Sequence, residues 1–295
     1  PEQADPKVKH FILNWRAEPI GPNDPIVKLV LPPEGLFSLP TSVDLRSQQS
    51  KVKNQGQYGA CTAFASTGAF EYLLKANNLL SSDPWGSELF VYYVTRVYEM
   101  HGSASSDSGA SLTATTQTFQ QYGICTYNSM PYVNSSGQTN IAQAPNQSQF
   151  SEAKQNLLIS PARVDESSDK NLVLSNVKTL LSQQIPVYIG FNVYSQMMTT
   201  QVSQTGIVPP PRSGNQVGGH AILLVGYDDN NNWFIFKNSW NTTWGKGGYG
   251  FLPYSYILQS EASDFWTMQK AVVGSDGKQI SILPEPSPAP GPSPA

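Results

Sequence analysis

The sequence predicts an α+β protein with two lobes, because helical patterns dominate its first half and strand patterns its second. Large apolar residues recur at helical spacing between residues 60 and 130. Short runs of β-branched and aromatic residues follow between residues 184 and 255. With 295 residues, of which 39% are hydrophobic, the chain is long and apolar enough to bury a large core.

The individual elements follow from these patterns. Residues 60–76 are apolar nearly all round, which indicates a buried helix, and residues 89–100 repeat large apolar side chains at helical spacing. Strands are expected at 185–189, 221–225 and 233–236. The run of Asp and Asn at 228–232 predicts a hairpin turn between the last two strands.

The two ends differ from the middle in composition. Residues 1–38 form a Pro-rich extension with one expected strand at 25–31, which Pro32, Pro33 and Gly35 terminate. Residues 281–295 are expected to be a disordered tail, since Pro alternates there with small residues from Pro284 onward. Between them lies the main domain, 39–280, with a mainly helical lobe at 39–165 and a mainly β lobe at 166–280.

Composition excludes several classes of function. A net charge of −3 with 13% charged residues argues against nucleic acid as the main partner. The apolar run 221–225 is too short to span a bilayer. The two cysteines exclude a disulfide scaffold and a cysteine zinc site, and the histidines (His10, His101, His220) show no metal-ligand spacing, so we expect no metal. The uncharged polar composition suggests a secreted or exported protein whose signal peptide has been removed.

Cys61 lies where a glycine-bearing turn, Gly56 to Gly59, runs into the expected helix. The free N–H groups and positive dipole at a helix N-terminus stabilise a thiolate and lower the pKa of a thiol there. A buried, inert cysteine is the alternative that this segment alone leaves open.

A second group of residues favours the reactive interpretation. His220 precedes the expected strand 221–225, and Asn238 follows the strand 233–236. Pairing of these strands would bring the two side chains together. An imidazole can act as base toward a thiol while an amide oxygen accepts from its other nitrogen and fixes its tautomer.

These segments resemble the papain family of cysteine peptidases, with more similarity to its bacterial members. The resemblance covers residues 39–255 and rests on short motifs in the family order: Leu39 to Arg46, Asn54-Gln55-Gly56, Gly59-Ala60-Cys61, Gln121 to Ile124, Met130-Pro131-Tyr132, Gly219-His220-Ala221, Lys237-Asn238-Ser239-Trp240 and Trp244 to Gly250. It implies a papain-like fold in which a helical lobe and an antiparallel, β-barrel-like lobe enclose an active-site cleft.

The resemblance also assigns roles. Cys61 would be the nucleophile and His220 its base, with Asn238 orienting the imidazole. Gln55 would donate to the oxyanion. Supporting positions are Trp240, which would shield the His–Asn hydrogen bond, and Trp244.

Substrate binding is implied for Gly219 and for the segment Ser108-Gly109-Ala110, where the family usually has a glycine pair. Gly109 would offer main-chain hydrogen bonds to an extended peptide. Ser111 and Leu112 would line a specificity pocket that prefers apolar side chains. Cys125 matches no catalytic position and is expected to be a free, packed thiol.

The resemblance therefore implies a cofactor-free hydrolase of peptide or protein substrates that acts through a thioester. An endopeptidase is favoured over a carboxypeptidase, because residues 133–150 contain no Lys, Arg or His to hold a terminal carboxylate. Residues 1–38 would be either an inhibitory pro-segment or a plain packing arm. Two other classes stay open: a thiol acyl transferase, such as a transpeptidase or deamidase, and a catalytically silent binding module on the same fold.

Overall fold

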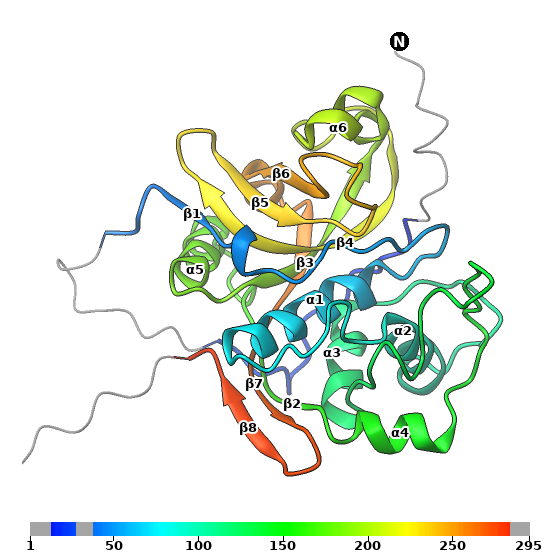
Figure 1. Cartoon of the computed structure of the whole chain (residues 1–295). Helices are drawn as coiled ribbons and strands as arrows, with labels where there is room; N and C mark the ends of the chain where they lie inside the picture. The colour runs from blue at the N-terminus through cyan, green and yellow to red at the C-terminus, as the bar shows by residue number, and fades with distance from the viewer. Residues whose placement is uncertain (1–12, 28–37, 284–295) are drawn as a thin grey trace, which may run out of the picture.

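The computed structural model describes residues 13–27 and 38–283. In Figure 1 a group of helices lies at the lower right, and the strands run from the upper part of the view to its lower edge, with further helices beside the upper strands. The helices are α1 (Cys61–Ala76), α2 (Glu88–Val94), α3 (Leu112–Gln121), α4 (Gln147–Ala153), α5 (Lys170–Ser182), α6 (Thr200–Thr205) and α7 (Ser255–Leu258), with a π-helical turn at Thr95–Glu99 and 3-10 turns at Arg46–Gln48 and Ser195–Met198.

Within these residues all strands belong to one antiparallel sheet in the order β2-β7-β3-β4-β5-β6, with β1 also paired to β4 and β8 to β7. The strands are β1 (Ser42–Asp44), β2 (Leu157–Arg163), β3 (Val187–Tyr194), β4 (Gln216–Asp228), β5 (Trp233–Lys237), β6 (Tyr249–Pro253), β7 (Ala262–Val273) and β8 (Lys278–Ser281). The α+β arrangement expected from the sequence, with helices and an antiparallel sheet, is confirmed.

Helix α1 is the central element. It packs against β3, β4 and β7 on one side and against α2 and α3 on the other. Because both sides are covered, every residue from Cys61 to Leu74 is buried, which explains why its sequence is apolar nearly all round. The catalytic candidate at its first residue is therefore held between the two lobes.

The expected elements are present, and several are longer than predicted. The strand predicted at 221–225 is the middle of β4, and the turn at 228–232 joins β4 to β5. The helix predicted at 89–100 is α2 continued by the π-helical turn. Strand β2 lies in the half assigned to helices, because it pairs with β7 from the far end of the chain.

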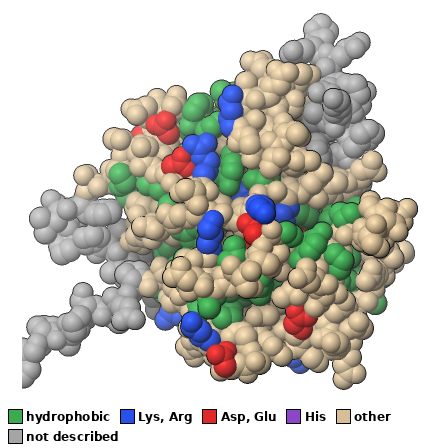
Figure 2. All heavy atoms as spheres, in the orientation of Figure 1, with side chains coloured by type: hydrophobic (Ala, Val, Ile, Leu, Met, Phe, Trp, Pro, Cys, Tyr) green, Lys and Arg blue, Asp and Glu red, His purple; other side chains and the backbone are tan. Residues whose placement is uncertain are grey.

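The extension contributes ordered contacts to the domain. Residues 13–27, which we call the strap, pair with Gly219, Ala110 and Arg163 through isolated parallel bridges. The strand predicted at 25–31 is represented by the bridge of Ile26 with Arg163, while 28–31 lie outside the described residues, as do 284–295 of the predicted tail. Figure 2 shows one face of the molecule, where charged side chains are sparse among uncharged polar surface.

Candidate active site

The Cys61 thiol is fully buried at the N-terminus of α1. The backbone N–H groups of Ala221, which follows His220, of Thr62 and of Cys61 itself favour the charged form of the thiol. Burial raises the pKa of the Cys61 thiol to about 12, against the lowering effect of these N–H groups. The covered site thus holds the neutral thiol at physiological pH.

His220 lies on β4, one residue before the Ala221 N–H that acts on the Cys61 thiol, and Asn238 lies just beyond β5. The pairing of β4 with β5 brings the two side chains together, with 2.8 Å between His220 Nε2 and Asn238 Oδ1. His220 Nδ1 is buried and has no hydrogen-bond partner among the described residues. Burial lowers the pKa of His220 to about 4, although the bond to Asn238 opposes that shift. One ring nitrogen is therefore fixed and the other is available.

Aromatic rings cover the histidine. The Trp240 ring stacks on the imidazole with ring centroids 4.6 Å apart, and Phe191 meets it edge-on at 5.9 Å. Trp244 in turn packs edge-on against Trp240 at 5.4 Å. Trp240 thus lies directly on the imidazole that Asn238 holds, and Trp244 packs against Trp240.

Gln55 is fully buried and is tied to the same strand end as Asn238. Its Oε1 accepts from the Ser239 hydroxyl at 2.5 Å, and its backbone N–H donates to the Ser239 carbonyl at 2.9 Å. Its Nε2 donates to the Tyr58 carbonyl at 2.8 Å. An amide nitrogen carries two hydrogens, so a second one remains for another acceptor.

The opposite wall of the cleft is formed by the segment that leads into α3. Ser108 is half-buried, whereas Ala110 and Leu112 are buried. Gly109 has φ of 68°, and a β-carbon there would lie 1.9 Å from the carbonyl oxygen of Asn14. The Gly109 N–H donates to the Tyr92 hydroxyl at 3.2 Å and not to the strap. The neighbouring Ala110 carbonyl instead accepts a hydrogen bond from the strap.

The strap joins the two walls across the cleft. The Trp15 N–H donates to the Gly219 carbonyl and the Arg16 N–H donates to the Ala110 carbonyl, both at 3.1 Å. Asn14 lies over the turn before Cys61, where a β-carbon on Gly59 would come within 2.8 Å of the Asn14 Cβ. The strap thus occupies the main-chain groups that flank the thiol and the imidazole.

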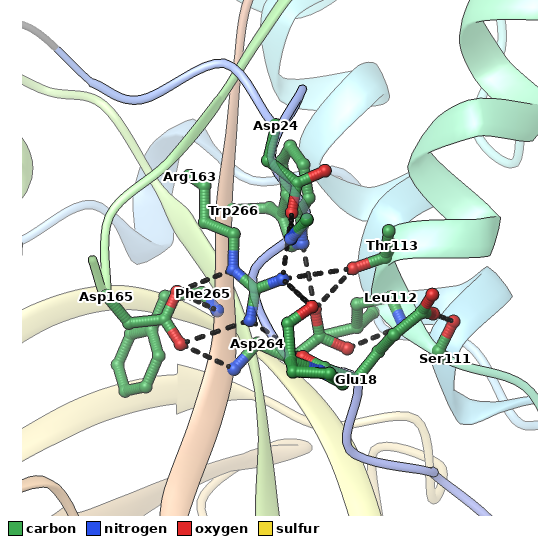
Figure 3. Close-up of polar contacts among 12 residues, drawn as sticks. Glu18, Asp24, Ser111, Leu112, Thr113, Arg163, Asp165, Asp264, Phe265 and Trp266 are labelled. Carbon is green, nitrogen blue, oxygen red and sulfur yellow. Dashed lines mark hydrogen bonds and ion pairs between the residues drawn. The ribbon is translucent and has the colours of Figure 1, made fainter.

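A buried arginine holds the rest of the strap (Figure 3). Arg163, at the end of β2, donates to the Glu18 carbonyl at 2.9 Å and lies 3.2 Å from the Asp24 carboxylate. On the domain side it pairs with Asp165 at 2.8 Å and lies 3.7 Å from Asp264. We call Asp24, Arg163, Asp165 and Asp264 the strap cluster.

A second buried group of charges lies behind Asn238, and we call it the core cluster. It consists of Lys53, Glu71, Glu88 and Lys237. Lys53 pairs with Glu71 at 2.6 Å and with Glu88, while Lys237 reaches Glu71 through the Ser50 hydroxyl. Burial would raise the pKa of Glu71, but the charges of Lys53 and Lys237 lower it to about 2. Burial lowers the pKa of Lys237 to about 8.

Sequence reasoning missed Asp107, which fixes the turn before the thiol. Both its carboxylate oxygens accept from the Gly59 N–H, at 3.0 and 3.1 Å, and the Tyr92 hydroxyl donates to it as well. It also missed Trp15, Arg163 and Asp264. None of these residues belongs to a short motif, so no local signal pointed to them.

Comparison with known proteins agrees with this geometry. The profile described as papain family cysteine protease matches residues 39–256. The chain is 34% identical over 242 residues to an uncharacterized peptidase C1-like protein of Acanthamoeba polyphaga mimivirus, covering 80% of this chain and 75% of the viral one.

The chain belongs to the papain family of cysteine proteases. It is also 28% identical to mouse cathepsin K, over 75% of this chain and 61% of the cathepsin. The crystal structure of xylellain, a cysteine protease from Xylella fastidiosa, superposes with a TM-score of 0.74 at 26% identity and covers 87% of this chain and 95% of xylellain.

Two further predictions from the sequence concern Cys125 and membrane-spanning helices. Cys125 is free and buried among the packed side chains of the hydrophobic core, as predicted. Over residues 13–27 and 38–283, none of the helices combines the length and apolar character that crossing a bilayer requires.

Proposed function

We propose that this papain-family peptidase cleaves internal peptide bonds through Cys61, His220 and Asn238, and that the strap inhibits it until it is displaced. The observation that carries the proposal is the imidazole of His220, fixed by Asn238 through Nε2 and unpartnered at Nδ1 among the described residues. It precedes Ala221, whose N–H acts on the thiol at the start of α1. An oriented base beside a helix-terminal thiol is the arrangement that nucleophilic catalysis needs.

The reaction is acyl transfer to water. His220 takes the Cys61 proton, and the thiolate attacks the peptide carbonyl carbon. The imidazolium then protonates the leaving amine as the C–N bond breaks, leaving a thioester. Water, deprotonated by the same imidazole, hydrolyses the thioester and restores the thiol.

Gln55 and the Cys61 N–H would stabilise the oxyanion of both tetrahedral intermediates. Ser239 fixes the side-chain oxygen of Gln55, which leaves its amide nitrogen to donate. We expect Gln55→Ala to lower kcat about 100-fold or more while Gln57→Ala, an exposed residue of the same turn, has little effect. Equal loss in both variants would contradict this role.

Endopeptidase action is supported by the loop at 133–150. This loop borders the site, since the Tyr58 hydroxyl donates to the Thr139 carbonyl at 3.1 Å, and it contains no cationic side chain. Nothing in it would select a substrate by its terminal carboxylate.

Inhibition by the strap is supported by its position over the cleft and by the burial of Cys61. Crystal structures of proenzymes, including digestive procathepsin L 3 of Tenebrio molitor, share the fold at a TM-score of 0.59 and 24% identity. Displacement of the strap would admit water to the thiol and imidazole. Desolvation would then weaken, so the thiolate–imidazolium pair would form more readily.

The central test compares wild type, Cys61→Ala and Cys125→Ala. Each is incubated with a peptide mixture, with and without an added amine, and products and N-termini are analysed by mass spectrometry. We expect hydrolysed internal bonds from wild type and Cys125→Ala, none from Cys61→Ala, and loss of residues ahead of Leu39 only where Cys61 is present.

Other outcomes would assign other functions. Ligated products would indicate a transpeptidase, and a one-unit mass change of a side-chain amide would indicate a deamidase. Peptide binding without turnover would indicate a binding module. We also propose export, on the uncharged polar composition, which secretion assays of the source cells would test.

A further inference from the structure

We infer that the cavity filled by Trp15 is a substrate side-chain pocket that selects tryptophan through the Asp264 carboxylate. This inference rests on the proposed peptidase function. The strap is an extended peptide bound to the main chain of both cleft walls, at Gly219 and Ala110. A substrate bound to the same groups presents its side chain to the same pocket.

The pocket is shaped for a large flat side chain. The Trp15 indole is buried against Gly190 on β3, where a β-carbon would lie 1.8 Å from Trp15 Cε2. A β-carbon on Gly219 would come within 2.7 Å of Trp15 Cε3. Two positions without side chains therefore create the space that the indole occupies.

The floor of the pocket carries a carboxylate that faces the indole nitrogen. Trp15 Nε1 donates to Asp264 Oδ2 at 3.4 Å. Asp264 lies in a bulge of β7, because Tyr188 pairs with Trp266 whereas Gly190 pairs with Ser263. Its φ of 62° is rare for a residue with a side chain. A bulge and a left-handed residue at one position are the features that redirect a side chain toward a site.

The domain itself holds this carboxylate in place. Asp264 Oδ1 accepts from Trp266 Nε1 at 2.9 Å and from the Thr113 hydroxyl at 3.0 Å, and Oδ2 accepts from the Leu112 N–H at 2.9 Å. The bulge is fixed in turn by Asp165, which accepts from the Asp264 and Phe265 N–H groups. None of these contacts uses the strap, so they persist when a substrate replaces it.

Charge balance favours an indole over a guanidinium. Arg163 lies 3.7 Å from Asp264 and compensates its negative charge. The carboxylate therefore attracts a basic substrate side chain less strongly. When the strap is removed, Asp264 Oδ2 loses one neutral hydrogen-bond donor, the Trp15 indole N–H. The pocket therefore differs from the apolar one expected beside Leu112, because a polar group selects among aromatic side chains.

The test uses the full chain with Trp15→Ala, which vacates the pocket. Cleavage of fluorogenic peptide libraries, each with one fixed position, is measured as kcat/KM. We expect one position at which Trp exceeds Phe roughly tenfold, as for one hydrogen bond to a charged acceptor. Asp264→Asn should bring that ratio close to one, while Asp276→Asn, in the exposed β7–β8 turn, should leave it unchanged.

A steric variant and a binding assay keep the test independent of turnover. Gly190→Val should abolish cleavage with Trp or Phe at that position but not with Ala. In Cys61→Ala, Trp15→Ala protein, a peptide of residues 13–19 should bind roughly tenfold more tightly than its Trp15→Phe version. Hydrolysis without a Trp preference, preference for Arg or Lys, or equal binding of the two peptides would overturn the inference. Absence of hydrolysis with the binding difference retained would contradict only the proposed activity.

Discussion

The two buried clusters of charges differ in what they join. In the core cluster, Lys53, Glu71, Glu88 and Lys237 all belong to the domain, and Glu71 also accepts from the Trp85 and Gly86 N–H groups at 3.1 and 3.0 Å. In the strap cluster, Arg163 is shared between carboxylates of the domain and groups of the strap.

This difference separates the contacts that the proposed displacement of the strap would break from those that it would keep. Removing the strap takes one carboxylate from Arg163 but leaves Asp165 and Asp264 in contact with it. The arginine is therefore compensated in both states. Every residue of the core cluster belongs to the domain, so none of them can leave without unfolding it. The core cluster therefore maintains the fold, whereas the strap cluster is compatible with the proposed displacement of the strap.

The largest expected effect is the loss of the core cluster. Glu71→Ala leaves Lys237 without a nearby buried carboxylate and Lys53 with Glu88 as its one carboxylate partner in the core cluster, and we expect the free energy of unfolding to fall by about 3–5 kcal/mol. Urea unfolding followed by tryptophan fluorescence measures this. Glu71→Gln, which retains acceptors for the two backbone N–H groups, should lose less. If Glu71→Ala lowered the free energy of unfolding by less than about 1 kcal/mol, the core cluster would not be the one that maintains the fold.

The second expected effect is on the pH dependence of stability. The pKa of His220 is lowered from 6.5 to about 4, so the unfolded chain binds this proton first and stability falls as pH drops from about 6.5 to about 4. The pKa of Asp264 is raised by burial from 3.8 to about 6, so its contribution has the opposite sign and partly offsets that loss.

Urea midpoints at pH 7 and pH 4 measure this balance. Each contribution is about 2–3 kcal/mol, so we expect wild type to show a net loss below about 1 kcal/mol between the two, and His220→Gln, which keeps only the opposing Asp264 contribution, to be relatively more stable at pH 4. If the free energy of unfolding fell more between pH 7 and pH 4 in His220→Gln than in wild type, the pKa of His220 would not be lowered in the folded state.

The smallest expected effect on the fold is at the strap. Asp24→Ala removes a strap partner of Arg163 and should increase the rate of Cys61 alkylation by iodoacetamide about 5- to 30-fold, while the urea midpoint of the domain changes little. Asp276→Ala, in the exposed turn, is the matched control, and the buried Cys125 thiol is an internal reference. Unchanged labelling in Asp24→Ala would mean that the strap does not control access.

The sequence was sufficient for the parts of the site that lie in short segments. Cys61 at a turn-to-helix junction, and His220 and Asn238 on neighbouring strand patterns, each carry a local signal. The strand pairing that joins the last two is set by the hairpin between them, which the Asp and Asn residues at 228–232 indicate.

The pocket and the strap cluster could not be predicted in this way. Trp15 and Asp264 are 249 residues apart, and their contact depends on a bulge in a strand whose sequence pattern was not recognised. Arg163 lies in β2, which is interrupted by Pro161 and which pairs only with a distant strand. Such contacts follow from register and tertiary packing rather than from local propensity.

The glycines that admit the strap have a consequence for how this protein evolves. Side chains at Gly109, Gly190 or Gly219 would collide with Asn14 or Trp15, and they would equally obstruct any peptide that follows the same path. A side chain added at any of these glycines would therefore disturb both the strap and a substrate on that path. Natural variation that tunes the resting activity should therefore accumulate in residues 13–27, while the groove itself drifts little.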